Sequence, residues 1–389
     1  MPPEARAACL LPMPSTSWPD RFAAWRDRLQ ASAGFRSWAA RFPLTRPIAR
    51  SRARQLFDLC AGFTYTQTLA ACVHLDLFTI LAQGPRTAAA LAMRLSTPVD
   101  ATTRLLDAAV ALKLAERRSG GRYGLGSLGC AMLDNDGVVA MVHHNAALYA
   151  DLRDPVALLR GKAPGALSAA WPYAETDQPT TLTAEQTDSY TALMAASQSF
   201  IAEEVLAAYD FKPHRCLLDI GGGDGTFLRH VAAQTPTLQL KLLDLPSVAA
   251  RATERFAASP YASRAEAFGG NAKTGPLPAG ADIASFIRVL HDHDDADVLA
   301  MLRQARAALP ADGTLLIAEP MSGTKGSERI GDAYFGFYFL AMGQGRSRTV
   351  EALSALLEQA GFTAIRELRT RVPMLARVLT ARPNEITKP

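Results

Sequence analysis

The stretch RVLHDHDD, in the last third of the chain, places a histidine beside a carboxylate. His291 and Asp292 follow an apolar run that is typical of a buried strand. Histidine can take up a proton near neutral pH, so it suits the role of general base for a hydroxyl group, which is a poor nucleophile while it keeps its proton. Glu319 ends the next apolar run, TLLIAE. Its carboxylate could accept a hydrogen bond from His291 and hold the imidazole in one tautomer.

A metal site is the alternative interpretation of this stretch, because His291, Asp292, His293 and Asp294 are all of metal-ligand type. Neighbouring residues at a strand end point in different directions, however, and no second histidine cluster follows. We therefore expect no metal. Asp294 and Asp295 are expected to form the acidic start of the next helix.

A second pattern is the glycine-rich sequence LLDIGGGDGTFLRHVAA. Asp219 ends an apolar run, and Gly221, Gly223 and Gly225 follow in DxGxGxG spacing. Glycines allow a sharp turn from strand to helix and let a ligand approach the main chain closely. The pattern is not the dinucleotide fingerprint GxGxxG, because Thr226 occupies its sixth position, and no Gly-Lys-Ser/Thr of a P-loop follows. By itself the pattern also fits a plain strand–helix turn.

An acidic residue about 20 positions later favours a nucleoside site. Asp244 ends the next apolar run, LLDLP, where a carboxylate can accept hydrogen bonds from both ribose hydroxyls. A helix cap is the other role open to Asp244. We expect the adenine near Gly270 and Asn271, after the third strand, and Arg288 among the residues that bind the cofactor.

These residues need strands and helices to position them, and the second half of the chain alternates short apolar runs with helical segments. Such alternation predicts a parallel sheet covered on both faces, after a long helix over residues 184–209. Ligands bind at the carboxyl ends of such strands. Besides the third strand, which is expected before Gly270, the expected strands lie within residues 215–220, 238–244, 281–290, 313–319, 362–370 and 374–383.

The first half has apolar residues at helical spacing, notably over 54–69 and 75–81. A short helix at TAAALAMRL, a helix that begins at Asp100 and a hairpin at GGRYGLG together predict a winged-helix unit. Residues 162–183 are expected to be a loop between domains.

Composition gives the setting of these elements. The apolar fraction is 49% and the charged fraction 20%, as in folded enzymes, and five scattered cysteines without a CxxC pair favour free thiols in a reducing compartment. No stretch approaches 18 uninterrupted apolar residues, and the N-terminus lacks the apolar core of a signal peptide. We expect a cytoplasmic protein whose proline-containing residues 1–17 are a mobile tail.

The first 60 residues are strongly basic, with ten arginines against four acidic residues. Trp18, Phe22, Trp25 and Leu29 fall on one face of a predicted helix over residues 18–29. Aromatic side chains with arginines suit the headgroup region of an anionic bilayer, so peripheral contact with the inner membrane is one expectation. Packing of this helix on a partner subunit is the alternative.

Five motifs in order, LLDIGGGDG, LLDLP, RVLHDHDD, LIAEP and GRSRT, resemble those of the plant-type O-methyltransferase family, which includes caffeate and acetylserotonin methyltransferases. The likeness covers nearly the whole chain from about Gln55. It implies an α/β fold, with a Rossmann-like class I methyltransferase domain preceded by a helical, winged-helix-like dimerisation domain. It also implies S-adenosylmethionine as cofactor, a homodimer, and a catalytic group in which His291 is the base, Asp292 stands beside it and Glu319 orients it.

The expected domains are a basic extension over residues 1–50, the dimerisation domain over 51–183 and the catalytic domain over 184–389. The chain departs from the family pattern in three places. The family usually has aspartate at the position of Asn271 and tryptophan at that of His293. Many members have a second orienting glutamate where this chain has Ser347, so Glu319 remains as the orienting carboxylate.

A bacterial group within the family, the hydroxyneurosporene O-methyltransferases, is similar over FDLCAGFTYTQTLAACVHLDLF, RVLHDHDDADV and DAYFGFYFLAMGQGR. This likeness predicts a lipophilic acceptor, a hydroxylated carotenoid. Aromatic residues concentrated on one helix agree with it, because they would hold a long polyene by apolar contact; packing within the domain core is the other interpretation. The helix carries Tyr334, Phe335, Phe337, Tyr338, Phe339 and Met342. A polyketide or phenolic acceptor is the main alternative.

Two other classes of function compete. A winged helix with a basic segment could belong to a DNA-binding regulator, but the arginines precede the winged-helix stretch, so we expect no nucleic-acid partner. A nicotinamide-dependent oxidoreductase would need the sixth-position glycine that Thr226 replaces.

Overall fold

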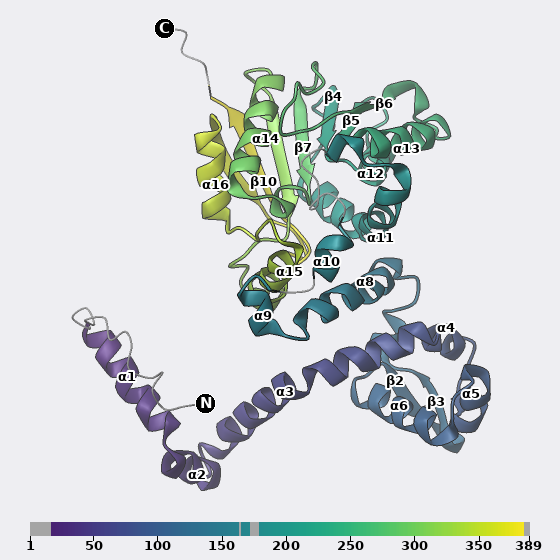
Figure 1. The fold of residues 1–389 in the computed structure, drawn as a ribbon, viewed down its shortest axis with the longest axis vertical. Helices are drawn as coiled ribbons and strands as arrows, with labels where there is room; N and C mark the ends of the chain where they lie inside the picture. Colours follow the sequence, from purple (N-terminus) through teal and green to yellow (C-terminus); the bar gives the residue numbers. More distant parts are fainter. Residues whose placement is uncertain (1–16, 163–164, 172–178, 385–389) are drawn as a thin grey trace. The chain divides into compact units, whose positions relative to one another are not determined.

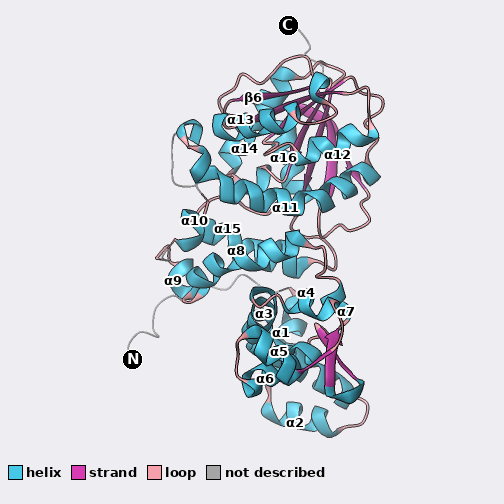
Figure 2. Ribbon diagram, turned by 90° about the vertical axis from the view of Figure 1, so that its right-hand side faces the viewer, coloured by secondary structure: helices cyan, strands magenta, loops and turns pink. Residues whose placement is uncertain are grey.

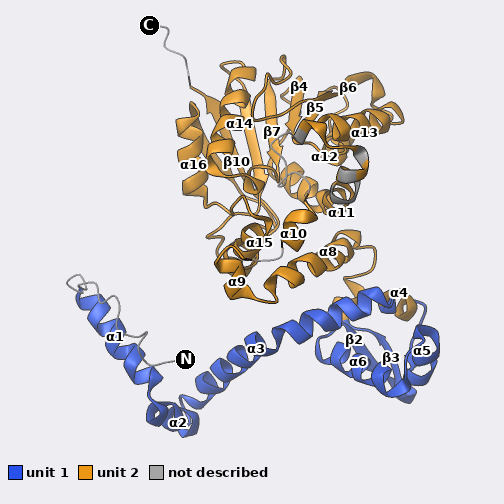
Figure 3. Ribbon diagram, viewed as in Figure 1, with its two compact units in different colours: residues 1–77, 83–126 blue, residues 78–82, 127–389 orange. Residues whose placement is uncertain are grey.

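A computed structural model describes residues 17–162, 165–171 and 179–384. The chain forms two compact units, residues 1–77 with 83–126 and residues 78–82 with 127–389 (Figure 3). Apart from Ser17, the tail expected over residues 1–17 lies outside the described residues. Helix α4 (Leu77–Ala82) belongs, apart from Leu77, to the second unit.

The first unit begins with three helices, α1 (Trp18–Ala31), α2 (Ala33–Arg41) and α3 (Arg46–His74) (Figure 1). Ser17 begins α1 and Ser32 begins α2, because each hydroxyl accepts a hydrogen bond from a backbone N–H three residues ahead. The apolar spacing indicated only the middle of α3, which starts eight residues before the expected position 54.

The remainder of the first unit is a small helix-and-sheet module. Thr87 caps α5, since its hydroxyl accepts a hydrogen bond from the N–H of Ala90, and Gly120 and Gly121 have positive φ angles in the hairpin turn. The strands pair in the order β1-β3-β2. This order of helices and hairpin confirms the winged-helix-like prediction. The elements are β1 (Arg86–Thr87), α5 (Ala88–Leu95), α6 (Val99–Ala111), β2 (Ala115–Arg118), η2 (Ser119–Gly121) and β3 (Arg122–Leu125).

The second unit contains a seven-stranded sheet in the order β6-β5-β4-β7-β8-β10-β9, drawn in magenta in Figure 2. Strands β4 to β8 are parallel, and β10 is antiparallel to both β8 and β9. This mostly parallel sheet confirms the Rossmann-like prediction. The strands are β4 (Cys216–Ile220), β5 (Gln239–Asp244), β6 (Ala265–Gly269), β7 (Ile283–Ile287), β8 (Thr314–Glu319), β9 (Phe362–Leu368) and β10 (Arg377–Pro383).

Helices cover both faces of the sheet. Apolar side chains of α11, α12 and α13 form a core cluster on one face, and those of α14 and α16 form another with the opposite side chains of the strands. Short 3-10 turns, η5 (Ala262–Arg264) and η6 (Leu290–Asp292), lie before β6 and after β7. The covering helices are α11 (Ala184–Ala208), α12 (Thr226–Gln234), α13 (Pro246–Ala257), α14 (Asp295–Ala308) and α16 (Val350–Gln359).

A further group of helices in the second unit packs around α15. Tyr338 and Phe339 of α15 share an apolar cluster with Leu148 of α8 and Leu167 of α10. The region 162–183, expected to be a plain loop, thus contains a helix, because Leu167 is buried in this cluster. The elements are α7 (Ser127–Cys130), α8 (Asp136–Leu152), α9 (Pro155–Leu159), α10 (Ala166–Ala169), η4 (Pro179–Thr181), the π-helix η7 (Arg329–Tyr334) and α15 (Phe335–Met342).

The described residues contain no helix long and apolar enough to cross a membrane. Within the same ranges no group of three or more His, Cys, Asp or Glu side chains is arranged to hold a metal ion. The four described cysteines, Cys60, Cys72, Cys130 and Cys216, are free thiols.

Candidate functional site

The glycine turn after β4 needs glycine at particular positions. Gly221 has a φ of +70°, and a Cβ added there would lie 2.7 Å from Cγ2 of Val289. Its N–H donates a hydrogen bond of 2.8 Å to the carbonyl of Leu243 at the end of β5. Gly223 also has a positive φ, but a Cβ there would meet no atom within 4 Å. The main chain at Gly223 therefore faces open space, as a ligand-binding turn requires.

Asp244 holds this turn from the neighbouring strand. Its Oδ2 accepts a hydrogen bond of 2.8 Å from the N–H of Gly223, and its Oδ1 accepts one of 2.7 Å from the N–H of Leu245. Burial raises the pKa of the Asp244 carboxyl to about 6, although these two N–H donors oppose the rise. The position that caps helix α13 is Leu245. Asp244 is thus better described as an acid that fixes the turn than as a helix cap.

A cavity at the carboxyl ends of the strands brings most of the expected cofactor residues together. Asp292, of the three expected catalytic residues, also borders it. Its lining combines carboxylate and amide side chains, backbone groups and apolar side chains, which suits a nucleoside-containing ligand. Of the expected cofactor residues, the cavity is lined by Gly221, Gly223, Asp244, Gly270, Asn271 and Arg288.

Asp219, the seventh expected cofactor residue, does not line this cavity. It is buried, and its Oδ1 accepts a hydrogen bond of 2.7 Å from the hydroxyl of Ser285 on β7. Burial raises the pKa of Asp219 to about 7. Asp219 thus links the central strands β4 and β7 next to the glycine turn. It would affect ligand binding indirectly, by holding that turn in place.

Arg288 follows β7 in a conformation that non-glycine residues adopt rarely, with a φ of 57°. Its guanidinium donates hydrogen bonds to Oγ of Ser197, at 2.7 Å, and to Sδ of Met194, at 2.8 Å. Both partners belong to α11. Arg288 and Met194 both line the cavity, so this contact fixes the α11 wall to the end of β7.

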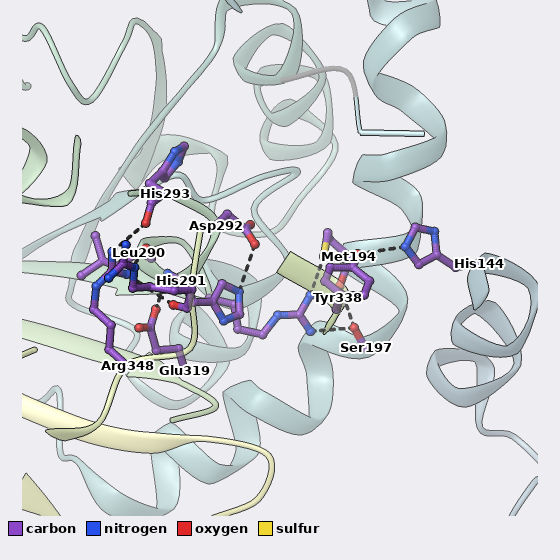
Figure 4. A network of polar contacts seen from close by, with 12 residues as sticks. His144, Met194, Ser197, Leu290, His291, Asp292, His293, Glu319, Tyr338 and Arg348 are labelled. Carbon is purple, nitrogen blue, oxygen red and sulfur yellow. Dashed lines mark hydrogen bonds and ion pairs between the residues drawn. The ribbon is translucent and has the colours of Figure 1, made fainter. Parts of the chain in front are cut away.

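His291 lies in the turn η6 (Figure 4). It is not among the residues that line the cavity, although its neighbours Asp292 and His293 are. Its Nε2 lies 3.4 Å from Oδ1 of Asp292. The rings of Phe335 and Phe339 lie 6.0 and 5.2 Å from the imidazole, centroid to centroid. Burial, followed by the positive charges of Arg288 and Arg348, lowers the pKa of His291 to about 3. The ring is therefore neutral at physiological pH and can accept a proton.

Glu319 contacts His291 in a different way from the one expected. Its Oε2 accepts a hydrogen bond of 3.1 Å from the backbone N–H of His291, not from the imidazole. Its other oxygen, Oε1, is buried without a hydrogen-bond partner among the described residues, and so is Nδ1 of His291. Burial raises the pKa of Glu319 to about 7. Glu319 thus holds the backbone of the η6 turn. The side-chain hydrogen bond expected from the sequence would join Oε1 of Glu319 and Nδ1 of His291, which are the two atoms without a partner in the described ranges.

His293, at a position where the family usually has tryptophan, lines the cavity with Trp171. Their ring centroids are 6.4 Å apart. Burial lowers the pKa of His293 to about 4, so it also presents a neutral ring. Asp294 caps α14 and Asp295 begins it, which agrees with their expected place at the start of that helix.

Several residues at the site were missed from the sequence. Asp224 gave a signal, because it lies within the glycine motif and lines the cavity. Trp171, Met194 and Gln198 gave none, since they come from segments distant in the sequence. A further missed residue is Arg348, which is buried and whose guanidinium contacts the carbonyls of Leu290 and His293.

Comparison with known proteins agrees with this geometry. A model of the O-methyltransferase domain matches residues 149–363, and a model of the O-methyltransferase dimerisation domain matches residues 57–135. The demethylspheroidene O-methyltransferase of Cereibacter sphaeroides is 40% identical over 364 residues, which cover 92% of this chain and 94% of that protein. The enzyme of the same name from Rhodobacter capsulatus is 39% identical over 346 residues, covering 88% and 85%.

Among solved structures, a methyltransferase of calicheamicin biosynthesis in its S-adenosylhomocysteine-bound form superposes with a TM-score of 0.71 at 26% identity. The match covers 86% of this chain and 98% of that one.

Proposed function

The chain belongs to the S-adenosylmethionine-dependent O-methyltransferases, and we propose that its acceptor is the hydroxyl group of a hydroxylated carotenoid. The observation that carries the proposal is the pair of aromatic rings, Phe335 and Phe339, packed against the imidazole of His291. They belong to a helix made almost entirely of apolar and aromatic residues. Two relatives about 40% identical over most of the chain are named for demethylspheroidene.

The cofactor of this family is S-adenosylmethionine, and the cavity fits it. When bound, it supplies an electrophilic methyl group on a positively charged sulfur. In the proposed arrangement, Asp244 accepts hydrogen bonds from the ribose hydroxyls, since each of its oxygens has a lone pair beyond the one already used by a backbone N–H. Gly270 and Asn271 border the adenine, and the open main chain at Gly223 lies beside the amino-acid part.

His291 is the proposed general base. The neutral imidazole accepts the proton of the acceptor hydroxyl at Nε2, the ring nitrogen on the side of Asp292, which borders the cavity. The acceptor oxygen forms its new bond to the methyl carbon as the carbon–sulfur bond breaks, so a positive charge leaves the sulfur and one appears on the imidazole. The total charge of the buried site is unchanged, and a histidine of low pKa can act here for that reason. The proton finally passes to water.

Asp292 and Glu319 support this base in the proposal. Oδ1 of Asp292, 3.4 Å from Nε2, stabilises the imidazolium that forms. Glu319 fixes the backbone of His291 and, through its unpartnered Oε1, offers an acceptor for the N–H at Nδ1. Such a bond would hold the tautomer that leaves Nε2 free to accept a proton.

The aromatic helix supports the proposal of an apolar acceptor. Tyr338 and Tyr334 direct their hydroxyls to His144 and Asn145 of α8, at 2.9 and 3.0 Å, so these groups are already occupied. The rings of Phe335 and Phe339 beside His291 are hydrocarbon, and such a surface would hold a polyene by apolar contact, at about 25 cal/mol per Å² buried. Tyr338, Phe339 and Met342 are themselves buried in the α8–α10–α15 cluster, so Phe335 is the ring best placed to touch an acceptor.

The dimerisation domain supports a homodimer. For the basic extension we propose contact with an anionic membrane surface, where a carotenoid would be dissolved. Trp18 is 77% exposed and Trp25 is 54% exposed on α1, with Phe22 and Leu29 also exposed. The arginines of this segment would attract acidic headgroups.

An experiment with lipid extracts of carotenoid-producing cells tests the acceptor without choosing a candidate substrate in advance. The protein is incubated with the extract and S-adenosylmethionine that carries a deuterated methyl group, and mass spectrometry identifies every labelled product. We expect label in a hydroxylated carotenoid. Label only in phenolic or polyketide compounds would overturn the acceptor and leave the reaction class in place.

A further inference from the structure

The loop after α15 holds the turn that carries the proposed base. The guanidinium of Arg348 donates hydrogen bonds to the carbonyl of Leu290, at 2.9 Å, and to that of His293, at 2.7 Å. These two carbonyls flank His291 and Asp292 on either side, as Figure 4 shows. Nε of Arg348 donates to Oδ1 of Asp295 at 2.9 Å, so one side chain binds three points of the segment 290–295.

The same loop makes two backbone contacts with this segment. The N–H of Arg346 donates a hydrogen bond of 2.9 Å to the carbonyl of His291, and the N–H of Gly345 donates one of 3.1 Å to Oδ1 of Asp294. Gly345 has a φ of +83°, and a Cβ added there would lie 2.5 Å from the carbonyl oxygen of His291. The close approach therefore requires glycine.

Arg348 is deeply buried, with 3% of its surface exposed, and its positive charge is balanced by Asp295. A buried guanidinium costs free energy unless its donors are all used. Here its donors reach backbone carbonyls and one carboxylate, an arrangement that only the planar fork of arginine can make.

From this arrangement we infer that Arg348 is a positioning residue for methyl transfer, which fixes the His291–Asp292 turn beside the cofactor cavity. The inference rests on the proposed role of His291 as base. Arg348 does not touch the cavity; it acts through the carbonyls of Leu290 and His293. The loop is also continuous with α15, whose Phe335 and Phe339 pack on the imidazole, so one segment holds both the backbone and the ring of His291.

Two substitutions separate this role from general stability. Arg348→Lys keeps the charge but loses the fork, and Arg346→Met is the matched control, because its side chain is 59% exposed and pairs with the same Asp295 at 3.4 Å. The backbone contact of residue 346 remains in that control. We expect Arg348→Lys to lower kcat for demethylspheroidene about 10–100-fold, since a displacement near 1 Å can cost that much. KM for S-adenosylmethionine should change less than about threefold.

Hydrogen exchange supplies a readout that needs no acceptor. With S-adenosylhomocysteine bound, amides of residues 288–295 should exchange faster in Arg348→Lys and in Gly345→Ala, and at the wild-type rate in Arg346→Met. Wild-type exchange and kcat in both Arg348→Lys and Gly345→Ala would overturn the inference. A wild-type protein that does not methylate demethylspheroidene would instead contradict the proposed acceptor, and the exchange data would still decide the role of Arg348.

Thermal unfolding shows whether Arg348→Lys is folded, and its affinity for S-adenosylhomocysteine distinguishes a local effect from a general loss of the fold. A folded Arg348→Lys protein with an unchanged affinity for S-adenosylhomocysteine and a reduced kcat supports positioning. A parallel loss of cofactor affinity and kcat would indicate that Arg348 only maintains the fold, and would contradict the inference.

Discussion

The backbone N–H of His291 donates a hydrogen bond of 3.1 Å to Oε2 of Glu319. This bond joins the turn after β7 to the last residue of β8, so the two neighbouring strand ends hold the proposed base between them. Glu319 is fully buried, and burial raises its pKa to about 7.

A consequence for stability follows from that raised pKa. A carboxyl group whose pKa is higher in the folded than in the unfolded protein stabilises the fold below its unfolded pKa, and this contribution disappears as the pH rises through the folded value. The contribution of Glu319 to the unfolding free energy should therefore fall between about pH 4.5 and pH 7, while His291 and His293, whose pKa values are lowered, contribute in the opposite direction. Glu319→Gln keeps an oxygen for the N–H of His291 and should remove a part of this fall, on the order of 1–3 kcal/mol.

Urea unfolding at pH 5 and pH 8 measures the effect. Asp219 and Asp244 have raised pKa values and His291 and His293 have lowered ones, so other groups also set the pH dependence, and Glu319→Gln should change it by the Glu319 contribution alone. An identical difference between the two pH values in wild type and variant would contradict the burial of an ionisable Glu319.

The aromatic rings beside the base predict a change in pH dependence. Phe339 is buried against the imidazole, and Phe339→Ala would admit water beside it, so the pKa of His291 should rise from about 3 toward its ordinary value. Since only the neutral ring accepts a proton, the acid limb of the rate profile should move to higher pH. Phe337→Ala on the same helix is the control, because Phe337 is 37% exposed. An unshifted limb in a folded Phe339→Ala protein would refute the desolvated base.

Asp244 should dominate cofactor affinity. A hydrogen bond to a charged group contributes about 1.5–3 kcal/mol, so Asp244→Asn should weaken binding of S-adenosylhomocysteine about 10–150-fold. Ser285→Ala removes a buried hydrogen bond to Asp219 away from the cavity lining and should change affinity less than about threefold. Calorimetry compares the three proteins. Equal affinities would exclude Asp244 from the cofactor site.

Six of the seven expected cofactor residues line one cavity, and the sequence could predict that they lie together because the relations involved are local. The turn at Gly221 and Gly223 is encoded by glycines within one motif, and Asp244 follows at a strand end that parallel pairing of β4 and β5 places beside it. Each of these relations depends on neighbours in the sequence or on the register of adjacent strands. The family resemblance and the fold class followed from the same motifs.

The base side depended on long-range contacts and was predicted less completely. Arg348 reaches Leu290 and His293 across more than 50 residues, and no periodicity in the sequence indicates such a contact. The side-chain bond expected from Glu319 to His291 is a bond to its backbone instead, because the direction of a side chain at a strand end depends on the surrounding packing. The helix α10 appeared within an expected loop because Leu167 finds a buried cluster that only the folded chain provides.

Membrane contact through α1 is a further prediction. Substituting Trp18, Phe22 and Trp25 together by serine should reduce co-sedimentation with phosphatidylglycerol vesicles, because the exposed aromatic face is lost. Met93→Ser is the control, since Met93 is an exposed apolar residue outside the basic segment. Light scattering of the same variants tests the alternative. Unchanged co-sedimentation with a loss of the dimer would show that α1 packs on the partner subunit.

The most direct test of the account is the specificity constant for demethylspheroidene, measured against that for a catechol in the same detergent with S-adenosylmethionine as donor. We predict a clearly higher kcat/KM for demethylspheroidene, and a fall in its turnover of roughly 10²–10⁴-fold in His291→Asn, with cofactor affinity retained. Faster methylation of the catechol than of the carotenoid would contradict an apolar acceptor. A His291→Asn variant that turns over as fast as the wild type would contradict a histidine base.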